Sequence, residues 1–471
     1  MEKVKEGKVK KLWQKENKQN LNPIVEAFET GDDLLLDQNL ILCDVYGTMA
    51  HGLGLEKIGI LNSKEIEILK KGLSEIRDLY HAGKFNLVAG DEDVHTKIEN
   101  FLTEKYGLVG KKIHTGRSRN DQVLTAIRLF TREKLLNIWK NALDLCEAFI
   151  SFAKEYEFVL MPGYTHMQKA MPSSVGMWAG AFAESLFDDM EILKSVYKLN
   201  NQSPLGSAAA YGVPLELPRS FVAELLGFQK VQENSLYCQN SRLHIEAYIL
   251  SAFLGLLQTV NKFASDVMLF TTKEFDFFSV SENICTGSSI MPQKKNVDLA
   301  ELIRSKLHLV IGNQLSVVSL SANLPSGYNR DFQDGKKPLF ESLEIVIKSL
   351  VVTNILVENI EPNEDKMMEA LTPEIFATHE ALEAVGKGKS FREAYKDEGK
   401  KFEYQSTKFE TNTNGKNSKS FKTSNLLRKS THIGGTGNLG IKNYVLRIMN
   451  EKKVFSAASK KHYQTISRLL S

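Results

Sequence analysis

The 471-residue chain has few cysteines and no excess of charge of either sign. Its four cysteines, at positions 43, 146, 238 and 285, show neither CxxC spacing nor the density of a disulfide scaffold. The 60 basic and 57 acidic residues leave a net charge of +3, so nothing predicts bulk attraction to nucleic acid or to a membrane surface. We therefore expect reduced thiols, a cytoplasmic location, and no nucleic-acid or membrane partner.

Long apolar runs without charge are also missing. The most apolar segment, 245–270, is interrupted by Glu246 and Asp266 among other polar residues, which argues against a membrane span. Residues 1–11 are basic, but acidic residues interrupt them and no apolar core follows, so they do not resemble a signal peptide.

Strand signals are scarce, and long helical patterns take their place. We find no sustained period-two alternation. Over 245–270 the apolar residues recur every three or four positions, which indicates one continuous stripe on a helix of about seven turns. Similar patterns predict further long helices over 119–154, 173–199, 297–320 and 338–357. Such helices must bury their stripes against one another, so we predict an all-α fold built on a five-helix bundle. Residues 248–257 are apolar almost all round, which favours oligomerisation through the bundle.

The N-terminal part has shorter helical patterns, over Asp37–Ile60 and Ser63–Tyr80. Ser63 is the expected N-cap of the second pattern. A full capping box is not expected there, because Ile66 stands where the box needs Glu or Gln.

After Pro362 only brief helices are predicted. Residues 396–428 are rich in Lys, Asn, Ser and Thr, and we expect a loop or a partly disordered insertion. Gly435–Gly440 matches GxGxxG, but no strand precedes it and no βαβ unit surrounds it. We expect a flexible glycine turn there, and no nucleotide cofactor.

One polar stretch, Gly287–Asn296, combines small residues and a proline, so it should form a loop. A helical pattern follows, which Asn296 could cap and to which Asp298 adds an acid in the first turn. The loop would bring hydroxyls, two ammonium groups and free backbone N–H donors to a helix N-terminus, which suits an anion. Alone, the stretch is better explained as a lysine-bearing surface turn.

Three further polar stretches, Asp91–Thr96, His114–Gln122 and Pro162–Gln168, also precede helical segments, the last as a predicted loop. Each alone has an ordinary explanation as helix-start charge or as a structural histidine. A bundle could nevertheless bring such loops together at helix ends. Metal binding is poorly supported, because the histidines in these stretches lack i, i+4 spacing and no cysteine supports them. A Ser–His–Asp hydrolase is no better supported, because Ser288 is not in a GxSxG motif.

Together these stretches resemble one enzyme family. The run GSSIMPQKKN at 287–296 resembles the GSSxMPxKxN signature of the fumarase/aspartase superfamily. Four others are similar to its argininosuccinate lyase branch: EDVHT at 92–96, HTGRSRNDQ at 114–122, GYTHMQ at 163–168 and YNRDFQ at 328–333. The resemblance runs collinearly over roughly 12–357 and returns weakly at 391–395 and 431–439.

The resemblance implies a three-domain fold. We expect an N-terminal helical domain over 1–112, a long-helix bundle with the signature loop over 113–361, and a small C-terminal helical domain over 362–471 with the polar insertion 396–428. It also implies a homotetramer with a twenty-helix core, in which three subunits build each active site.

The implied reaction is the reversible elimination of argininosuccinate to arginine and fumarate, with no cofactor and no metal. Ser288 would be the general base, which requires a stabilised alkoxide and a loop that closes and excludes water. Lys294 with Asn296 would stabilise the negative charge that gathers on the intermediate. His166, oriented by Glu301, would protonate the leaving guanidine.

The implied substrate contacts come from several stretches. They are Asp93, His95, Ser118, Arg119, Asn120, Thr165, Arg242, Tyr328, Gln333 and Lys336, together with Asn296. The chain departs from the family pattern at four places: Val297 stands where the signature has proline, Leu243 stands where aspartate is common, residues 14–17 replace a GGRF segment, and 396–428 has no counterpart.

Two alternatives stand beside this expectation. Adenylosuccinate lyase and aspartase share the signature loop but not HTGRSRNDQ, so that segment discriminates against them. An inactive crystallin-like homologue is the other alternative. The presence of Ser288, Lys294, His166, Glu301 and Asp93 favours an enzyme.

Overall fold

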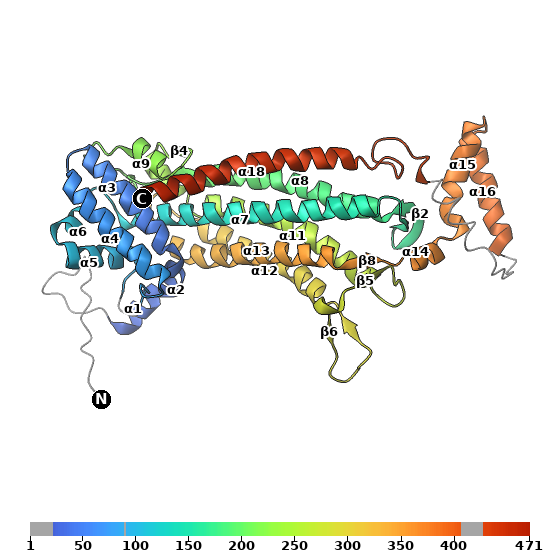
Figure 1. The fold of residues 1–471 in the computed structure, drawn as a ribbon, viewed down its shortest axis with the longest axis horizontal. Coiled ribbons are helices and arrows are strands. Elements are labelled where there is room, and N and C mark those ends of the chain that lie inside the picture. The colour runs from blue at the N-terminus through green and yellow to red at the C-terminus, as the bar shows by residue number, and fades with distance from the viewer. Residues whose placement is uncertain (1–21, 89–90, 407–426) are drawn as a thin grey trace.

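The computed structural model describes residues 22–88, 91–406 and 427–471, and helices dominate it (Figure 1). Within the described residues the helices that run along the long axis are α7 (Arg119–Glu155), α8 (Val175–Asn200), α11 (His244–Phe270), α12 (Asp298–Ser321), α13 (Lys336–Glu358) and α18 (Ile441–Leu469). The first five confirm the predicted bundle, with ends within about two residues of the predicted ones. The all-α fold class is confirmed.

The core lies where the apolar stripes meet. On α11 the stripe residues Phe253, Val260 and Phe263 are fully buried. Phe263 also packs edge-on against Phe149 of α7 and Phe182 of α8, with ring centroids 4.9 and 5.4 Å away. Each buried aromatic side chain contributes about 1.5–3 kcal/mol to folding. Among the described residues one stretch, 235–270, is long and apolar enough to span a membrane, and 61% of its most apolar window is buried inside the protein.

Shorter helices gather at one end of the bundle (Figure 1). They are α1 (Pro23–Thr30), α2 (Asp33–Asp37), α3 (Ile41–Lys57), α4 (Ser63–His81), α5 (Val94–Tyr106), α6 (Leu108–Lys112), α9 (Arg219–Leu225) and α10 (Ser235–Asn240), with a 3-10 turn over Gln38–Leu40. The expected cap of α4 is wrong by one residue. Asn62 is the N-cap, and the Glu65 side chain completes a full capping box, because the register starts at Asn62 and not at Ser63.

Several two-stranded ladders sit at loops. They are β1 (Leu160–Thr165) with β2 (Gln168–Ser174), β3 (Gln202–Ser203) with β4 (Lys230–Val231), β5 (Phe278–Val280) with β8 (Ile360–Pro362), and β6 (Thr286–Gly287) with β7 (Lys295–Asn296). Among the ladders of the described residues, β3 and β4 alone pair in parallel. The loop predicted over Pro162–Gln168 is therefore wrong: it is most of a β-hairpin, antiparallel from Leu160 opposite Ser174 to Thr165 opposite Gln168.

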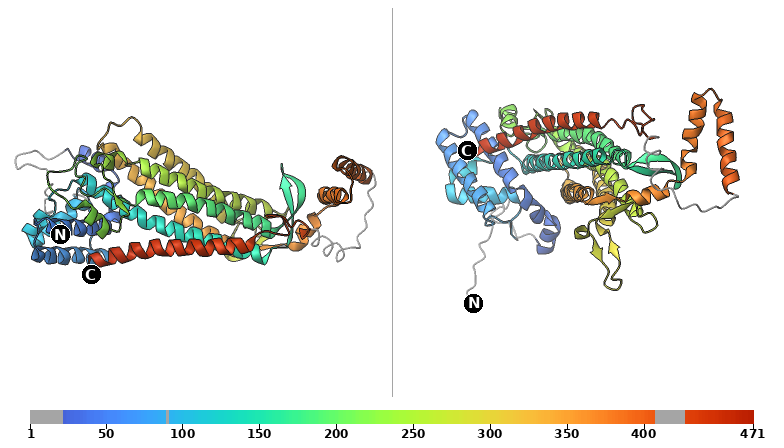
Figure 2. Two further views of the ribbon diagram at one scale, coloured as in Figure 1. Left: turned by 90° about the horizontal axis from the view of Figure 1, so that it is seen from above. Right: turned by 45° about the vertical axis from the view of Figure 1, so that its right-hand side comes forward.

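The C-terminal segment has two parts (Figure 2). Helices α14 (Glu364–Ala370), α15 (Ala377–Gly386) and α16 (Phe391–Ser406) lie at the far end of the bundle, whereas α18 returns along α7 to the N-terminal helices. The loop expected from residue 396 is wrong as far as 406, which is helical, and 407–426 lies outside the described residues. The predicted glycine turn at 435–440 is confirmed. The domain boundaries at 112/113 and 361/362 stay a prediction.

Candidate active site

A cavity of about 370 Å³ lies where the N-terminal helices meet the bundle. Sequence segments that are far apart line it: α1, α2, the start of α5, the start of α7, and the connection from α12 to α13. Eight of the predicted substrate contacts lie in its wall: Asp93, His95, Arg119, Asn120, Arg242, Tyr328, Gln333 and Lys336. Ser118, which is not among the lining residues, is the N-cap of α7 and forms a capping box with Asp121.

Asp93 and Arg119 form one charged side of the cavity. Asp93 caps α5 and accepts a hydrogen bond from Thr96 N at 2.7 Å. Arg119 makes ion pairs with Glu92 and Asp93. Burial acts to raise the pKa of Asp93, but the positive charges of His95 and Arg119 outweigh it, so this pKa is lowered. The carboxylate is therefore ionised, and Arg119 is held in place before any ligand binds.

Lys336 also lines the cavity and is almost fully buried. Its ammonium group is 2.7 Å from Asp33 Oδ1 and 2.7 Å from Asp37 Oδ1. Burial raises the pKa of Asp33 to about 6 even though Lys336 acts to lower it. The ammonium thus has two carboxylate partners, one of which is protonated near pH 6.

Arg242 supplies a third cation, next to two aromatic rings. Its guanidinium lies 5.3 Å from the ring centroid of Tyr328 and 5.2 Å from that of Phe332. These are cation–π distances, and they stabilise the position of the charge. The neighbouring Gln333 donates to Glu29 O at 2.8 Å, which ties the α12–α13 connection to α1.

His95 is buried behind the charged pair and is hydrogen-bonded on one side. Its Nδ1 is 2.8 Å from Asp44 Oδ1, and both side chains are 4% exposed. His95 Nε2 has no hydrogen-bond partner within the described part of the chain. Burial acts to lower the pKa of His95, but Asp44, with Asp93 and Asp37, outweighs burial and raises it.

The signature stretch stands away from this cavity. Its centre is the predicted loop, but its ends pair as β6 and β7, so it projects from the bundle as a hairpin (Figures 1 and 2). Ser288 Oγ accepts hydrogen bonds from Met291 N at 3.2 Å and from Ile290 N at 3.4 Å. Lys294 is exposed in the same loop.

The predicted cap of α12 is wrong. Val297 occupies the N-cap position without a side-chain hydrogen bond. Asn296 belongs to β7, where its amide donates to Gly287 O at 3.5 Å across the ladder. Pairing across the hairpin therefore replaces capping. Asp298 does lie in the first turn of α12, as predicted.

His166 lies at the tip of the β1–β2 hairpin. It and Met167 form the two-residue turn, with φ of 54° and 60°, and His166 and Thr165 are exposed. Glu301 is exposed in the first turn of α12. Within the described residues of one chain His166 and Glu301 make no hydrogen bond or ion pair with each other.

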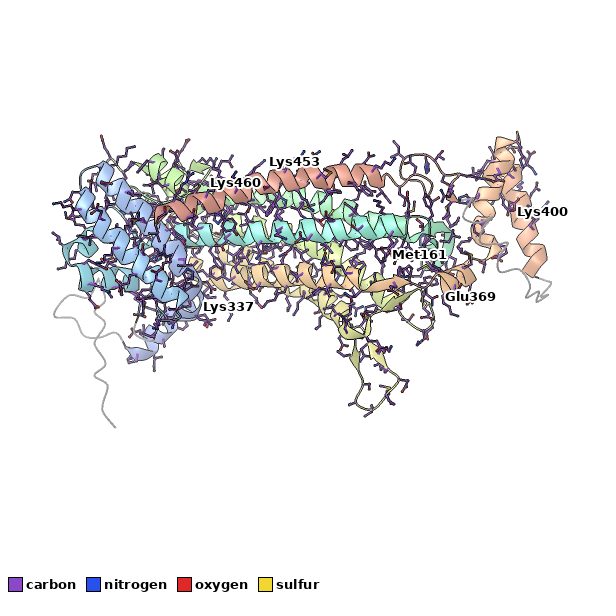
Figure 3. All side chains as sticks on the ribbon, viewed as in Figure 1. Met161, Lys337, Glu369, Lys400, Lys453 and Lys460 are labelled. Atoms are coloured by element: carbon purple, nitrogen blue, oxygen red, sulfur yellow. The ribbon has the colours of Figure 1, made fainter. Side chains whose placement is uncertain are left out.

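The predicted residues therefore fall into three separate places. Figure 3 labels Lys337, next to the cavity, at one end of α13 and Met161 of the β1–β2 hairpin at the other end of the bundle. Figure 1 places the β6–β7 hairpin apart from both. The cavity residues are brought together, whereas Ser288, Lys294, Asn296 and Glu301 form a second group, and Thr165 and His166 a third.

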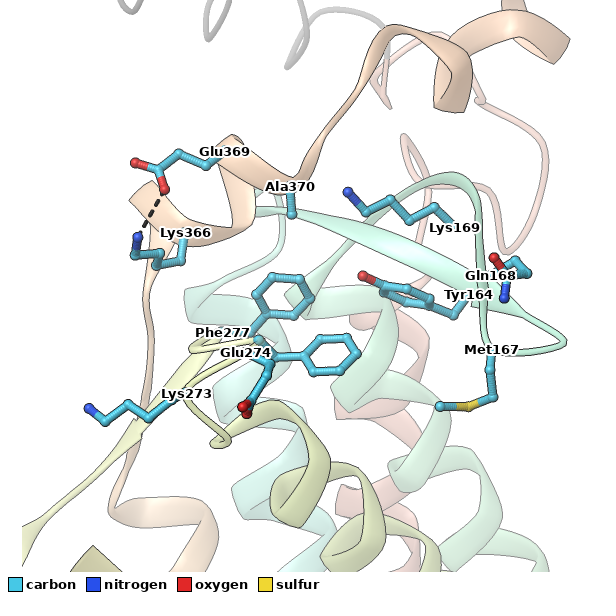
Figure 4. A pocket seen from close by; sticks show the side chains of 11 residues that line it. Tyr164, Met167, Gln168, Lys169, Lys273, Glu274, Phe277, Lys366, Glu369 and Ala370 are labelled. Carbon is cyan, nitrogen blue, oxygen red and sulfur yellow. Dashed lines mark hydrogen bonds and ion pairs between the residues drawn. The ribbon is translucent and has the colours of Figure 1, made fainter. Parts of the chain in front are cut away.

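A second cavity, of about 690 Å³, adjoins the β1–β2 hairpin (Figure 4). Tyr164 and Phe277 form aromatic walls, Lys169 and Lys273 add charge, and Lys366 is paired with Glu369 at 3.0 Å. None of the predicted catalytic residues lines this cavity. No group of three or more His, Cys, Asp or Glu side chains in the described ranges is placed to hold a metal ion.

Sequence reasoning missed the carboxylates that organise the first cavity. Asp33 and Asp37 hold Lys336, and Asp44 holds His95. Asp44 did leave a signal, since it is a lone acid within an apolar helical run. Asp33 looks like an ordinary helix-start acid, and only tertiary packing reveals its partner.

Comparison with known proteins shows the family to which the chain belongs. The sequence model of the Lyase family matches residues 8–312. Argininosuccinate lyase of Thermotoga neapolitana is 41% identical over 392 residues, covering 83% of this chain and 98% of the relative. That of Sorangium cellulosum is 41% identical over 386 residues, covering 82% and 89%.

Solved structures share the fold. An EDDS lyase variant with bound fumarate has a TM-score of 0.78 at 20% identity, covering 94% of each chain. The class II fumarase of Schistosoma mansoni has a TM-score of 0.66 at 18% identity, covering 79% of this chain and 90% of the fumarase.

The matched family model defines a lyase, and the fold of the chain is that of the EDDS lyase and class II fumarase structures. Within this class, the chain belongs to the argininosuccinate lyase family, of which the relatives named above are members. The family predicted from the sequence motifs is confirmed.

Proposed function

We propose that this chain cleaves argininosuccinate to arginine and fumarate in the cytoplasm, as a homotetramer whose active sites each draw on three copies of the chain. The observation that carries the proposal is the separation of the predicted residues into a cavity, the β6–β7 hairpin and the β1–β2 hairpin. One folded chain keeps these groups apart. Residues that must meet one small substrate then have to come from different copies.

The cavity suits the polar parts of the substrate. Argininosuccinate carries three carboxylates and one guanidinium, and the wall supplies Arg119, Arg242 and Lys336 as cations. Arginine forks pair with carboxylates through two parallel hydrogen bonds. The buried Asp93 beside Arg119 offers the opposite charge for a guanidinium.

The β6–β7 hairpin suits the base. A serine hydroxyl is far too weak to remove a carbon-bound proton unless its alkoxide is stabilised. Backbone N–H groups of Ile290 and Met291 already point at Ser288 Oγ, and donors preset in this way stabilise an oxygen that becomes negative. Lys294, from the same loop, would meet the second negative charge that gathers on the substrate carboxylate after proton removal.

His166 completes the reaction. We propose that Glu301 of another copy orients it, since the two do not meet within one chain, and that it protonates the leaving guanidine directly or through water. Exposure of both side chains in the single chain fits a partnership across an interface.

Mixing two inactive variants tests the shared site. We expect Ser288→Ala and His166→Asn each to abolish fumarate release, followed by its ultraviolet absorbance, while the Kd for argininosuccinate, measured by equilibrium binding, stays near the wild-type value. After the two are unfolded together and refolded, some sites take Ser288 from one variant and His166 from the other.

Mixed refolding should therefore restore measurable turnover, whereas each variant refolded alone stays inactive. A mixture that assembles fully but remains inactive would contradict shared sites. A wild-type protein that assembles but releases no fumarate from argininosuccinate would contradict the activity itself.

A further inference from the structure

We propose that Asp44 is a positioning residue: it fixes His95 as a doubly protonated imidazolium whose Nε2–H donates to a carboxylate of the bound substrate. The inference rests on the proposed function and deepens it. It assigns His95 a charged contact with the substrate. It also gives Asp44, which was not predicted as a site residue, the role of holding His95 in place.

The first observation is the geometry of the pair. Asp44 Oδ1 is 2.8 Å from His95 Nδ1, on α3 and α5 respectively. An ionised carboxylate only accepts hydrogen bonds, so the proton of this bond belongs to Nδ1. The hydrogen bond fixes the ring orientation, in the way that carboxylates orient catalytic histidines elsewhere.

The second observation is the orphaned atom on the other side of the ring. His95 is 4% exposed and lies in the cavity wall, and within the described residues its Nε2 has no partner. A buried polar nitrogen without a partner is unfavourable, because it has lost its hydrogen bonds to water. A ligand group that bonds to Nε2 restores a hydrogen bond, so the atom marks a place where the bound substrate makes contact.

The third observation is the charge around the ring. Three carboxylates act on it: Asp44 from α3, Asp37 from the end of α2, and Asp93 from the N-cap of α5 itself. Cations also stand nearby, with Arg119 of α7 paired to Asp93 and Arg117 electrostatically coupled to Asp44.

The balance of these charges favours the imidazolium. The pKa of His95 is raised, because the carboxylates outweigh the effect of burial. Nε2 then carries a proton and is a donor. In the neutral ring with Nδ1–H, Nε2 would be an acceptor and would repel a carboxylate.

Asp44→Asn tests the assignment with little change in shape. An asparagine oxygen still accepts from Nδ1–H, but the negative charge is lost, so buried His95 becomes neutral at a lower pH. We expect KM for argininosuccinate to rise roughly tenfold to a hundredfold at pH 7.5, the loss of one charged hydrogen bond, with kcat changing much less.

The pH profile separates positioning from a structural role. In the wild type, KM should climb where His95 loses its proton, and in Asp44→Asn that climb should move to lower pH. His95→Gln should have a high KM without the climb. Asp189→Asn, a matched change at a half-buried carboxylate on α8 that accepts from Thr259, should keep the wild-type KM and profile.

The inhibition constants of fumarate and of arginine provide a second measurement on the unaltered protein. The product whose carboxylate bonds to His95 should inhibit more weakly as the pH rises. Its inhibition constant should therefore increase in parallel with KM. The proposal is overturned if Asp44→Asn folds and keeps the wild-type KM profile, or if neither product shows the pH dependence. Failure of the proposed function is a distinct result, namely no turnover by the wild type at any pH.

Discussion

Acid should loosen the C-terminal helix through one buried histidine. α18 packs along α7, and His462 of α18 is 5% exposed beside the fully buried Arg132 of α7. Within the described part of the chain His462 Nδ1 has no hydrogen-bond partner. Burial first, and the charge of Arg132 second, lower the pKa of His462 from 6.5 to about 3.

The sign and size of the effect follow from linkage. Between pH 6.5 and about 3 the detached helix binds a proton that the docked helix does not, so the free energy of docking falls as the pH falls. From pH 7 to pH 4.5 the loss is about 2.5 kcal/mol, which is roughly a 70-fold increase in the opening of α18. Above pH 7 the histidine is neutral in both states and contributes almost nothing.

Hydrogen exchange measured by mass spectrometry on α18 peptides tests this directly. After correction for the intrinsic pH dependence of exchange, opening in the wild type should increase roughly 70-fold between pH 7 and pH 4.5. His462→Gln should remove most of this increase, because glutamine does not titrate. His81→Gln, at an exposed site in the last turn of α4, should behave like the wild type. If His462→Gln and the wild type open to the same extent at both pH values, the buried neutral histidine is not the cause.

Two further outcomes follow from the structure. Lys336→Met leaves Asp33 and Asp37 buried without their cation, and we expect the free energy of unfolding by denaturant to fall by about 3–5 kcal/mol. Adding Asp37→Asn should recover part of this loss. Unchanged stability of the single variant would refute the ion-pair argument. Leu315→Arg, at a side chain that is 64% exposed on α12, should leave the single-chain fold intact but shift the protein to smaller species in size-exclusion chromatography; an unchanged elution volume would show that this face of α12 lies outside the interface.

The helices that could be predicted from the sequence are those whose buried apolar residues recur with a helical period. The five bundle helices carry continuous apolar stripes, and their ends were placed within about two residues. α18 was missed because it lies on the outside of the bundle, where few of its residues, such as Ile441 and Ile448, are buried. A long helix with so narrow a buried stripe differs little from a polar segment.

The β1–β2 hairpin was missed for a different reason. Prolines stand in both strands, with Pro162 opposite Pro172, and proline weakens any strand prediction. The turn uses His166 and Met167 in the left-handed region, where Asn-Gly is the usual signal. The hairpin ladder is supplemented by packing of β1 on α14 and of β2 on the 3-10 turn Pro373–Phe376 at the end of the bundle.

The candidate site also has residues that could be predicted from the sequence and residues that could not. The stretches that line the cavity or carry the proposed catalytic groups could be singled out, because polar clusters before helices are unusual and match a family pattern. Their partners could not. Asp37 and Lys336 are 299 residues apart and meet only in the folded chain. The sequence motifs predict which groups take part in the reaction. The packing of α2 and α3 decides which of those groups are held in a charged state.

The exposed apolar side chains of α12 suggest how copies of the chain could pack so that the cavity and the two hairpins meet. Leu302 and Leu309 lie seven residues apart on one side of α12 and are 57% and 48% exposed, whereas Ile311, Leu315 and Val318 lie on another side and are 42%, 64% and 43% exposed. Exposed apolar rows of this kind suit packing against a partner helix. If two copies packed in parallel through α12, the two cavities would lie at one end and the two β1–β2 hairpins at the other. The cavity and the hairpin would then remain apart. Antiparallel packing brings the cavity of one copy to the end at which the other carries its β1–β2 hairpin. We propose that the copies pack antiparallel through α12, because that direction would bring His166 of one copy towards the cavity of another.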